Sequence, residues 1–358
     1  MRRRILFFPV LPLLLLLAGF FPHRATAGES APAPMLPDAA QARPLSPEHR
    51  MPVTVPQVWR TLTARLAADG ISGPDIDAYF ARLGEIPTQD PMGRKVRELY
   101  RRAFLRTPPD PNAPKTPRPR FYEGVATEEN ARRCREYLAA NAEAFASAEA
   151  RYGVPQSIAA ALLFVETRLG TMLGKESAFY TLASMAASTT PEHISLWLPK
   201  LPGYEAHLDW MTELMPKRAD WAYRELRALL AYARAQNIDP FTMPGSIYGA
   251  IGICQFMPSN LVPYGADGDG DGIVDLFTVP DAVASLSNYL AKHGWKPGIS
   301  RARRHALLKA YNRADIYANT IMALSDLITG AADPTRAVPR KSPSKTPNTR
   351  SPARQGGA

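Results

Sequence analysis

Apolar residues recur at helical spacing over most of the chain. In residues 55–104, the apolar residues Val58, Leu62 and Leu66 are each four positions apart. This spacing places side chains on one face of a helix. From residue 127 to about 329 the chain continues as helix-like segments separated by loops rich in glycine and proline, without a convincing run of alternating strand residues. The pattern predicts a mainly α protein.

The segment 153–170 predicts a helix that contains a candidate acid. Pro155 suits its first turn and Gly170 its end. Its apolar stripe consists of Ile158, Leu162, Val165 and Leu169. Glu166 lies beside this stripe, with no basic residue three or four positions away. A carboxyl group in apolar surroundings keeps its proton near neutral pH, as a general acid must. The alternatives are a Glu at the solvent edge of the helix and one paired with a distant arginine.

The first 27 residues are typical of a cleavable secretion signal. Three arginines precede an apolar stretch, and Ala25-Thr26-Ala27 fits the small residues of a cleavage site. An uncleaved membrane anchor is the alternative, but Pro9 and Pro12 within the stretch favour cleavage. The leader contains no cysteine, which argues against a lipoprotein. We therefore expect a periplasmic protein without stable membrane insertion.

Composition divides the remaining chain into four parts. Residues 28–53 are rich in alanine and proline and predict a disordered lead-in. Residues 54–120 predict a helical segment followed by a proline-rich linker. Residues 121–330 have the composition of a globular domain, and residues 331–358 predict a basic, disordered tail.

The formal net charge of +10 is concentrated at the two ends. The leader contributes +4 and the tail +5, which leaves +1 for residues 28–330. A nearly neutral body argues against a nucleic-acid-binding protein. Cys134 and Cys254 are the two cysteines. Export permits a disulfide, but the sequence does not decide whether the two residues meet.

Two further segments contain candidate binding residues. Residues 246–260, SIYGAIGICQFMPSN, predict a tight, packed loop beside a cleft. In this loop Ser246 and Gln255 are suited to hydrogen-bonding a sugar, although a buried glutamine can equally hold the loop together. Residues 310–318 place Asn312 and Tyr317 near the start of an amphipathic helix, where Asn312 suits a helix cap.

Together these segments resemble a known family. The chain contains Tyr-Gly-Val-Pro, then Val-Glu-Thr-Arg-Leu-Gly, then Gly-Ala-Ile-Gly-x-x-Gln-Phe-Met-Pro-Ser, then Tyr-Asn. This order resembles the lytic murein transglycosylase B family (the membrane-bound lytic transglycosylase B type, glycoside hydrolase family 103) over about residues 122–328. The resemblance implies a lysozyme-like helical catalytic core with an EF-hand-like ion loop, accompanied by extra helices and disordered ends.

The resemblance also implies a reaction. The family cleaves the β-1,4 bond between N-acetylmuramic acid and N-acetylglucosamine in peptidoglycan and leaves a 1,6-anhydromuramyl end. Its single catalytic glutamate corresponds to Glu166, which acts as acid and then as base. The substrate's own N-acetyl group replaces the second carboxylate that most glycosidases use. The implied partner is the glycan strand, with other cell-wall enzymes as further candidates and a monomer as the expected state.

The family's substrate-contacting residues correspond to several positions in this chain. Ser246 and Gln255 correspond to residues that contact N-acetylated sugars, Asn312 to one beside the reacting centre, and Tyr289 and Tyr317 to tyrosines that line the cleft.

A basic and aromatic run in residues 217–221 corresponds to another part of the family's binding site. In this run the resemblance implies that Arg218 contacts a muramyl carboxylate or peptide and that Trp221 stacks on a sugar.

Residues 267–272, DGDGDG, predict an ion-binding loop. Asp267, Asp269 and Asp271 occupy positions 1, 3 and 5 of an EF-hand pattern. The carbonyl of Ile273 would follow as the position-7 ligand. All of these donors are oxygen atoms, so we expect a structural Ca²⁺ or Na⁺ ion here. The reaction that the resemblance implies needs no cofactor.

The last ligand of this loop is less obvious. Thr278 stands where an EF-hand has its usual glutamate. The resemblance places the last carboxylate at Asp281, for which a helix cap is the alternative role, and Asp275 is a rival ligand.

The sequence departs from the family pattern at two places. Cys254 replaces a glycine expected before Gln-Phe, which predicts a small shift of the loop. Residues 191–216 read as an insertion with Trp197, Tyr204 and Trp210, either a lid over the cleft or a partner site.

Two other functions compete with a transglycosylase. A hydrolase would need a general-base carboxylate opposite Glu166, for which the sequence offers no obvious candidate. A non-catalytic wall-binding module would be marked by loss of the acid, whereas Glu166 is present.

Overall fold

The computed structural model describes residues 54–105 and 120–331. The predicted secretion signal, lead-in and basic tail, and nearly all of the proline-rich linker, lie outside these residues. Within the two described ranges, no helix combines the length and the apolar character needed to cross a bilayer.

Helices dominate the described residues, as the sequence predicts. They are α1 (Arg60–Ala68), α2 (Pro74–Arg82), α3 (Asp90–Phe104), α4 (Glu128–Ala140), α5 (Ala142–Tyr152), α6 (Gln156–Thr167), α7 (Ala178–Ala187), α8 (Leu208–Ala235), α9 (Leu261–Tyr264), α10 (Val279–Lys292), α11 (Arg301–Tyr311) and α12 (Asp315–Ile328). Two short strands, β1 (Glu176–Ser177) and β2 (Pro244–Gly245), pair antiparallel.

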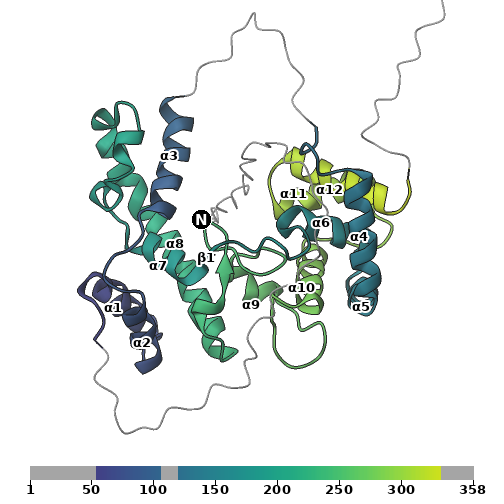
Figure 1. Ribbon diagram of the computed structural model, residues 1–358, viewed down its shortest axis with the longest axis horizontal. Helices are drawn as coiled ribbons and strands as arrows, with labels where there is room; N and C mark the ends of the chain where they lie inside the picture. Colours follow the sequence, from purple (N-terminus) through teal and green to yellow (C-terminus); the bar gives the residue numbers. More distant parts are fainter. Residues whose placement is uncertain (1–53, 106–119, 332–358) are drawn as a thin grey trace, which may run out of the picture.

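The helices form two groups with the short strands between them (Figure 1). One group contains α1, α2, α3, α7 and α8, and the other contains α4, α5, α6, α10, α11 and α12. A continuous set of buried residues joins both groups. Because α3 packs against α7 and α8, the N-terminal segment is part of the same body.

The helix that contains Glu166 is more deeply buried and shorter than the sequence predicts. Nine of the twelve side chains of α6 are buried, so the helix is covered almost all round. It ends at Thr167 and not at Gly170. Arg168 and Leu169 already adopt left-handed backbone angles, with φ of 52° and 62°. The Thr167 hydroxyl accepts a hydrogen bond from the Gly170 N–H (3.0 Å) and donates to the Ile253 carbonyl (2.8 Å), which fixes this early turn.

The predicted stripe of Val58, Leu62 and Leu66 is wrong at its first position. Val58 is 39% exposed, whereas Trp59 is fully buried with Leu62 and Leu66. Residues 57–59 form a 3₁₀ turn before α1 begins, and this changes the phase of the helix. The Trp59 indole N–H donates to the Gly84 carbonyl (2.6 Å) and so ties α1 to the end of α2.

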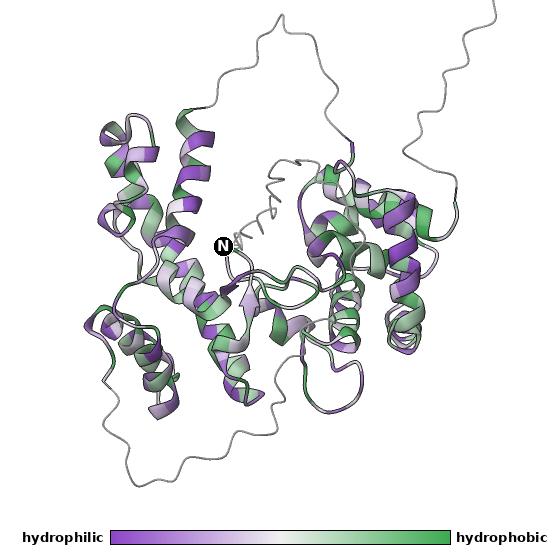
Figure 2. Ribbon diagram, in the orientation of Figure 1, coloured by the Kyte–Doolittle hydropathy of each residue, from purple (hydrophilic) through white to green (hydrophobic). Residues whose placement is uncertain are grey.

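The segment 191–216 packs against α3. It consists of three 3₁₀ turns, η4 (Pro191–Ile194), η5 (Leu198–Lys200) and η6 (Tyr204–His207), followed by the start of α8. Trp197 lies directly on Gly93, where an added Cβ would be 2.3 Å from the indole. His207 stacks on Phe104 at 3.8 Å between ring centroids. Figure 2 shows hydrophobic and hydrophilic residues alternating along α3, as a helix with one covered face requires.

Candidate functional site

A pocket of about 580 Å³ lies where the start of α3, the end of α6 and the loop after β2 meet. Its lining residues are Thr88, Asp90, Pro91, Arg94, Val165, Glu166, Arg168, Thr171, Met172, Leu173, Gly174, Lys175, Glu176, Thr181, Gly245, Ser246, Ile247 and Gln255. Three of the predicted site residues, Glu166, Ser246 and Gln255, therefore share one pocket. No residue of the 191–216 segment is in this lining.

Glu166 is the candidate acid of this pocket. Its side chain is partly buried and lines the pocket. Burial raises the pKa of Glu166 to about 7, and a hydrogen bond from the Tyr317 hydroxyl to Oε1 opposes this rise. No basic side chain of the described residues forms an ion pair with Glu166. Because its pKa is near neutrality, the group can both release and accept a proton at neutral pH.

Two tyrosines lie near this carboxyl group. Tyr317, in the first turn of α12, is 2% exposed and donates its hydroxyl proton to Glu166. Tyr122 is half-buried, and both burial and the nearby Glu166 raise its pKa. The Tyr122 backbone N–H donates to the Thr320 hydroxyl (2.8 Å), which holds residues 121–123 against α12. Sequence reasoning did not select Tyr122, because it precedes α4 and belongs to no periodic pattern.

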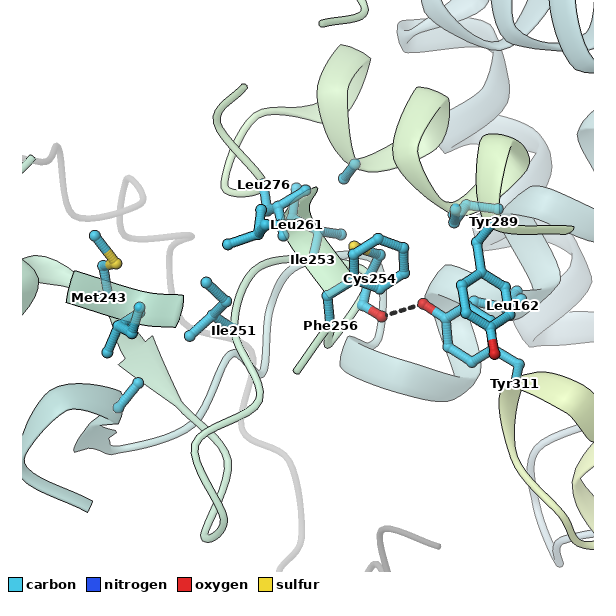
Figure 3. Packing of buried hydrophobic residues seen from close by; sticks show 14 of the residues in the cluster. Leu162, Met243, Ile251, Ile253, Cys254, Phe256, Leu261, Leu276, Tyr289 and Tyr311 are labelled. Carbon is cyan, nitrogen blue, oxygen red and sulfur yellow. Dashed lines mark hydrogen bonds between the residues drawn. The ribbon is translucent and has the colours of Figure 1, made fainter. Parts of the chain in front are cut away.

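The loop after β2 is tight, as the sequence predicts. Ile251 bridges Gly245 and Phe256, and Figure 3 shows Ile251, Ile253 and Phe256 packed in the core. Gln255 has a left-handed backbone (φ 53°), and its side-chain amide donates to the Gly252 carbonyl (3.0 Å). Gln255 therefore holds the loop together and also lines the pocket.

Ser246, like Gln255, both holds the loop together and lines the pocket. Its hydroxyl oxygen accepts hydrogen bonds from the backbone N–H groups of Tyr248 (3.3 Å) and Ala250 (3.0 Å). Its hydroxyl hydrogen makes no hydrogen bond to a described residue and is free to meet a ligand in the pocket.

The backbone at position 254 does not require the glycine that the family pattern has there, and cysteine fits. Left-handed angles in this loop fall at Gly249, Gly252 and Gln255, and not at Cys254. The Cys254 carbonyl accepts a hydrogen bond from the Tyr311 hydroxyl, drawn as a dashed line in Figure 3. Cys134 and Cys254 are both buried free thiols, so the two residues do not form a disulfide. Burial raises the pKa of each thiol to about 12.

Asn312 follows α11 and does not cap α12. Its backbone N–H donates to the Leu308 carbonyl at the end of α11, whereas α12 begins at Asp315 after Ala314. Asn312 is 7% exposed, and its Oδ1 has no hydrogen-bond partner among the described residues. Asn312 is therefore the C-terminal cap of α11 and not an N-terminal cap of α12, and its buried acceptor remains without a partner among the described residues.

Five of the predicted substrate contacts lie outside the pocket lining: Asn312, Tyr289, Tyr317, Arg218 and Trp221. Tyr289 is buried among aromatic rings, and its hydroxyl donates to the Ala310 carbonyl (3.0 Å). Arg218 is on α8, where burial lowers its pKa. Trp221, one helical turn later, packs partly buried against the core.

Acidic side chains of the predicted ion loop converge as candidate ligands. Carboxylate oxygens of Asp267, Asp269 and Asp281 lie within 4.8 Å of one another. Asp281 is 2% exposed, and burial and the two other aspartates raise its pKa. Within the described chain, no basic side chain forms an ion pair with these three residues. A close group of uncompensated oxygen donors fits a hard cation.

The structure distinguishes between the rival ligands of this loop. Asp281 lies in the first turn of α10, but its oxygens accept the N–H groups of Gly268 (2.7 Å) and Asp275 (2.5 Å) in the loop. The alternative role of Asp281 as a helix cap is therefore wrong. The Asp275 carboxylate accepts the Phe277 N–H (2.8 Å) and is outside the cluster.

Asp271 is also outside the three-carboxylate cluster. Its Oδ1 accepts the Ile273 N–H (2.7 Å), so the side chain bends back to its own loop.

The sequence matches the family model described as "Transglycosylase SLT domain" over residues 54–307, well over half of the chain. Membrane-bound lytic murein transglycosylase B of Escherichia coli is 33% identical over 147 residues. This alignment covers 41% of the present chain and 34% of the relative, so the chain spans about a third of that protein.

Solved structures share the fold. The Pseudomonas aeruginosa protein SltB3, solved in complex with NAG-anhNAM-pentapeptide, is 20% identical with a TM-score of 0.57; the match covers 76% of this chain and 78% of that chain. The E. coli lytic transglycosylase Slt35, solved in complex with calcium, is 19% identical with a TM-score of 0.54, over 80% of this chain and 98% of that chain. At these identities the matches establish the fold, and the predicted lysozyme-like helical core is confirmed.

Proposed function

Because the chain belongs to the transglycosylase SLT domain family, we propose that it is a lytic transglycosylase that cleaves the glycan strands of peptidoglycan. One observation supports this most directly. Glu166 lies in the pocket with a pKa of about 7 and without a basic partner among the described residues. A single carboxyl group of this kind can donate a proton and later remove one.

The proposed reaction needs one acid and no water. Protonated Glu166 donates its proton to the oxygen that links N-acetylmuramic acid to N-acetylglucosamine, and the bond between C1 and that oxygen breaks. The substrate's N-acetyl oxygen stabilises the positive charge at C1. The Glu166 carboxylate then removes the proton of the C6 hydroxyl, whose oxygen bonds to C1. The product is a 1,6-anhydromuramyl end, and Glu166 is protonated again.

A hydrolase remains the competing enzyme. It would need a second carboxylate to activate water, and the pocket contains two more, Asp90 and Glu176. Asp90 is occupied by Arg94 (2.9 Å) and by the Trp197 indole N–H (3.2 Å). Glu176 is exposed in β1. Neither has the buried, unpaired environment of Glu166.

Mass spectrometry of the muropeptides released from purified peptidoglycan separates these functions. A lytic transglycosylase leaves anhydro ends, whereas a hydrolase leaves ends heavier by one water molecule. Release of anhydro muropeptides is the expected result. Products that contain the added water would contradict the proposal, and no release would indicate a non-catalytic binding module.

The pH dependence of cleavage should follow Glu166. Because the free enzyme must hold the proton, kcat/KM is expected to fall as pH rises through about 7. Tyr317→Phe removes the hydrogen bond that lowers this pKa, so the falling limb should move to higher pH. Measured pH profiles of kcat/KM test both statements.

Tyr311→Phe is the matched control for this shift. The Tyr311 hydroxyl binds the Cys254 carbonyl and not Glu166. This substitution should lower the stability of the protein but leave the falling limb of the kcat/KM profile at the same pH. An unshifted limb in Tyr317→Phe would contradict the assignment of Glu166 as the titrating acid.

We further propose that Asp267, Asp269 and Asp281 bind a structural Ca²⁺ ion. The bound ion would neutralise the buried Asp281 and fix the loop next to α10. Asp271 and the Ile273 carbonyl complete the set that the sequence predicts. Na⁺ is the alternative cation.

Chelation should therefore lower the melting temperature of the protein. A ligand present at a hundred times its Kd stabilises the folded state by about 2.7 kcal/mol, and EDTA removes this term. Calorimetry with Ca²⁺ and with EDTA measures the difference. Asp267→Asn should abolish it, whereas Asp275→Asn should retain it, since Asp275 is outside the cluster. A melting temperature insensitive to EDTA would count against the site.

The site of action is also proposed from the sequence. Residues 1–27 direct export to the periplasm, where the glycan substrate lies. The monomeric state and any contact with other cell-wall enzymes remain proposals of the same kind.

A further inference from the structure

The residue after Thr167 brings an uncompensated positive charge into the pocket. Arg168 is half-buried and lines the pocket with Glu166. Of the other two cations in the lining, Arg94 pairs with Asp90 and Lys175 is exposed. In residues 54–105 and 120–331, the Arg168 guanidinium makes no ion pair and donates no hydrogen bond. The guanidinium nitrogens of Arg168 remain open to solvent, so either water or a ligand in the pocket can supply the missing acceptors.

The surroundings hold this guanidinium in place. Its Cζ lies 4.6 Å from the centroid of the Phe164 ring, which is fully buried in α6. Arg133 of α4 lies over the same ring at 5.7 Å. Burial and the repulsion from Arg133 lower the pKa of Arg168. A like charge nearby and the lack of a carboxylate both favour an anion at this position.

Arg168 also has an unusual backbone conformation. Its φ of 52° is a left-handed conformation that few non-glycine residues adopt. Such strain is retained where the surroundings fix it, and it often marks functional sites. If α6 had continued to Gly170, the side chain of residue 168 would have followed the helical phase. The early turn leaves Arg168 in the same pocket lining as Glu166, with its guanidinium over the Phe164 ring.

This charge does not disturb the acid. The group that lowers the pKa of Glu166 is the Tyr317 hydroxyl, and Arg168 has no such effect. The pocket therefore contains an acid with a pKa of about 7 and a separate cation.

We infer that Arg168 is a specificity-determining residue that binds a carboxylate on the muramyl unit of the glycan strand. The inference rests on the proposed function. A planar guanidinium binds a carboxylate through two parallel hydrogen bonds, which a lysine cannot reproduce. Muramyl units differ from N-acetylglucosamine by a lactyl group whose carboxylate is either free or extended by a peptide stem with its own carboxylates. Arg168 thus distinguishes muramyl strands from neutral glycans.

Binding measurements on three preparations of soluble glycan strands test this inference. Glu166→Gln serves as the reference, because it prevents cleavage, and Arg168→Gln is added to it. The first preparation bears peptide stems, the second has the stems removed so that the lactyl carboxylates are free, and the third is stem-bearing material whose carboxylates are converted to neutral amides. Loss of charged hydrogen bonds should weaken binding to a carboxylate-bearing strand about tenfold to a hundredfold.

The amidated strands decide between recognition and a structural role. Amidation should weaken binding by the reference protein and have little effect on the Arg168→Gln protein. If Arg168→Gln weakened binding equally to native and to amidated strands, the inference would be overturned. If Arg168→Gln weakens binding only to the stem-bearing strands, Arg168 binds a carboxylate of the peptide stem. If it weakens binding to the strands without stems, Arg168 binds the lactyl carboxylate.

Two further variants complete the experiment. Arg168→Lys keeps the charge without the planar fork and should recover only part of the affinity. Arg101→Gln removes an exposed charge at the far end of α3 and should bind like the reference. Full recovery with lysine would contradict two-point binding. A different result would contradict the proposed function itself: wild-type protein that releases no anhydro muropeptides.

Discussion

Glu166→Gln is expected to lower the rate of glycan cleavage by about 10²–10⁴-fold, the usual contribution of a general acid. Glutamine has nearly the same shape and can still accept the hydrogen bond from Tyr317, but it has no proton to donate to the glycosidic oxygen. Binding of glycan strands should change little. Turnover of peptidoglycan, followed by release of anhydro muropeptides, measures the effect.

Glu143→Gln is the matched control for this substitution. Glu143 is exposed on α5 and makes no ion pair with the described residues, so the control should cleave at the wild-type rate. Wild-type activity in Glu166→Gln would exclude the single-acid mechanism.

Glu166→Gln should also change how the stability of the protein depends on pH. The folded-state pKa of Glu166 is raised to about 7 from 4.5, so folding favours the protonated form. This contribution is fully present below pH 4.5 and is lost as pH rises to about 7. Glu166→Gln does not titrate, so relative to wild type it should gain roughly 2–3 kcal/mol between pH 5 and pH 8. Urea unfolding at both pH values measures this, and a constant difference would contradict the raised pKa.

Gly174→Ala should strongly destabilise the protein. Gly174 has a φ of 110°, and an added Cβ would lie 1.8 Å from the Gly245 carbonyl oxygen of β2. The chain must either move away from β2 or displace the loop that contains Ser246. We expect a loss on the order of 3 kcal/mol in the free energy of unfolding, together with lower cleavage activity, because both glycines line the pocket.

Gly298→Ala separates the clash from the backbone strain. Gly298 also has a left-handed backbone (φ 76°), but no atom lies within 4 Å of its added Cβ. The control should lose only about 1–2 kcal/mol, the cost of a left-handed alanine. Equal losses in the two variants would mean that the close approach of Gly174 to β2 does not matter. Urea unfolding of both proteins decides this.

The sequence determined the helical class and supplied the candidate acid. Apolar spacing in 153–170 and the lack of a basic neighbour on the helix made Glu166 a candidate, because these are local properties, and the family resemblance then selected it. Ser246 and Gln255 followed from a resemblance over several motifs, and the structure places both in the pocket with Glu166. Asp267 and Asp269 followed from their spacing in one short loop.

Tertiary structure decided the features that depend on residues far apart in the sequence. Tyr122 and Tyr317 reach Glu166 from segments on either side of α6, and no local pattern could show their proximity. The early end of α6 depends on the bond between Thr167 and the Ile253 carbonyl, 86 residues later.

Contacts between distant segments also decided the state of the cysteines, the position of residues 191–216 and the presence of a cation in the pocket. Export permits a bond between Cys134 and Cys254, but both are buried free thiols, one on α4 and the other in the loop after β2. Residues 191–216 pack on α3 because Gly93 leaves room for Trp197. Arg168 became a candidate only when the structure showed its left-handed backbone and its lack of an acceptor in the described chain. Local propensity determines helices, whereas burial and partners are set by contacts that form only in the folded chain.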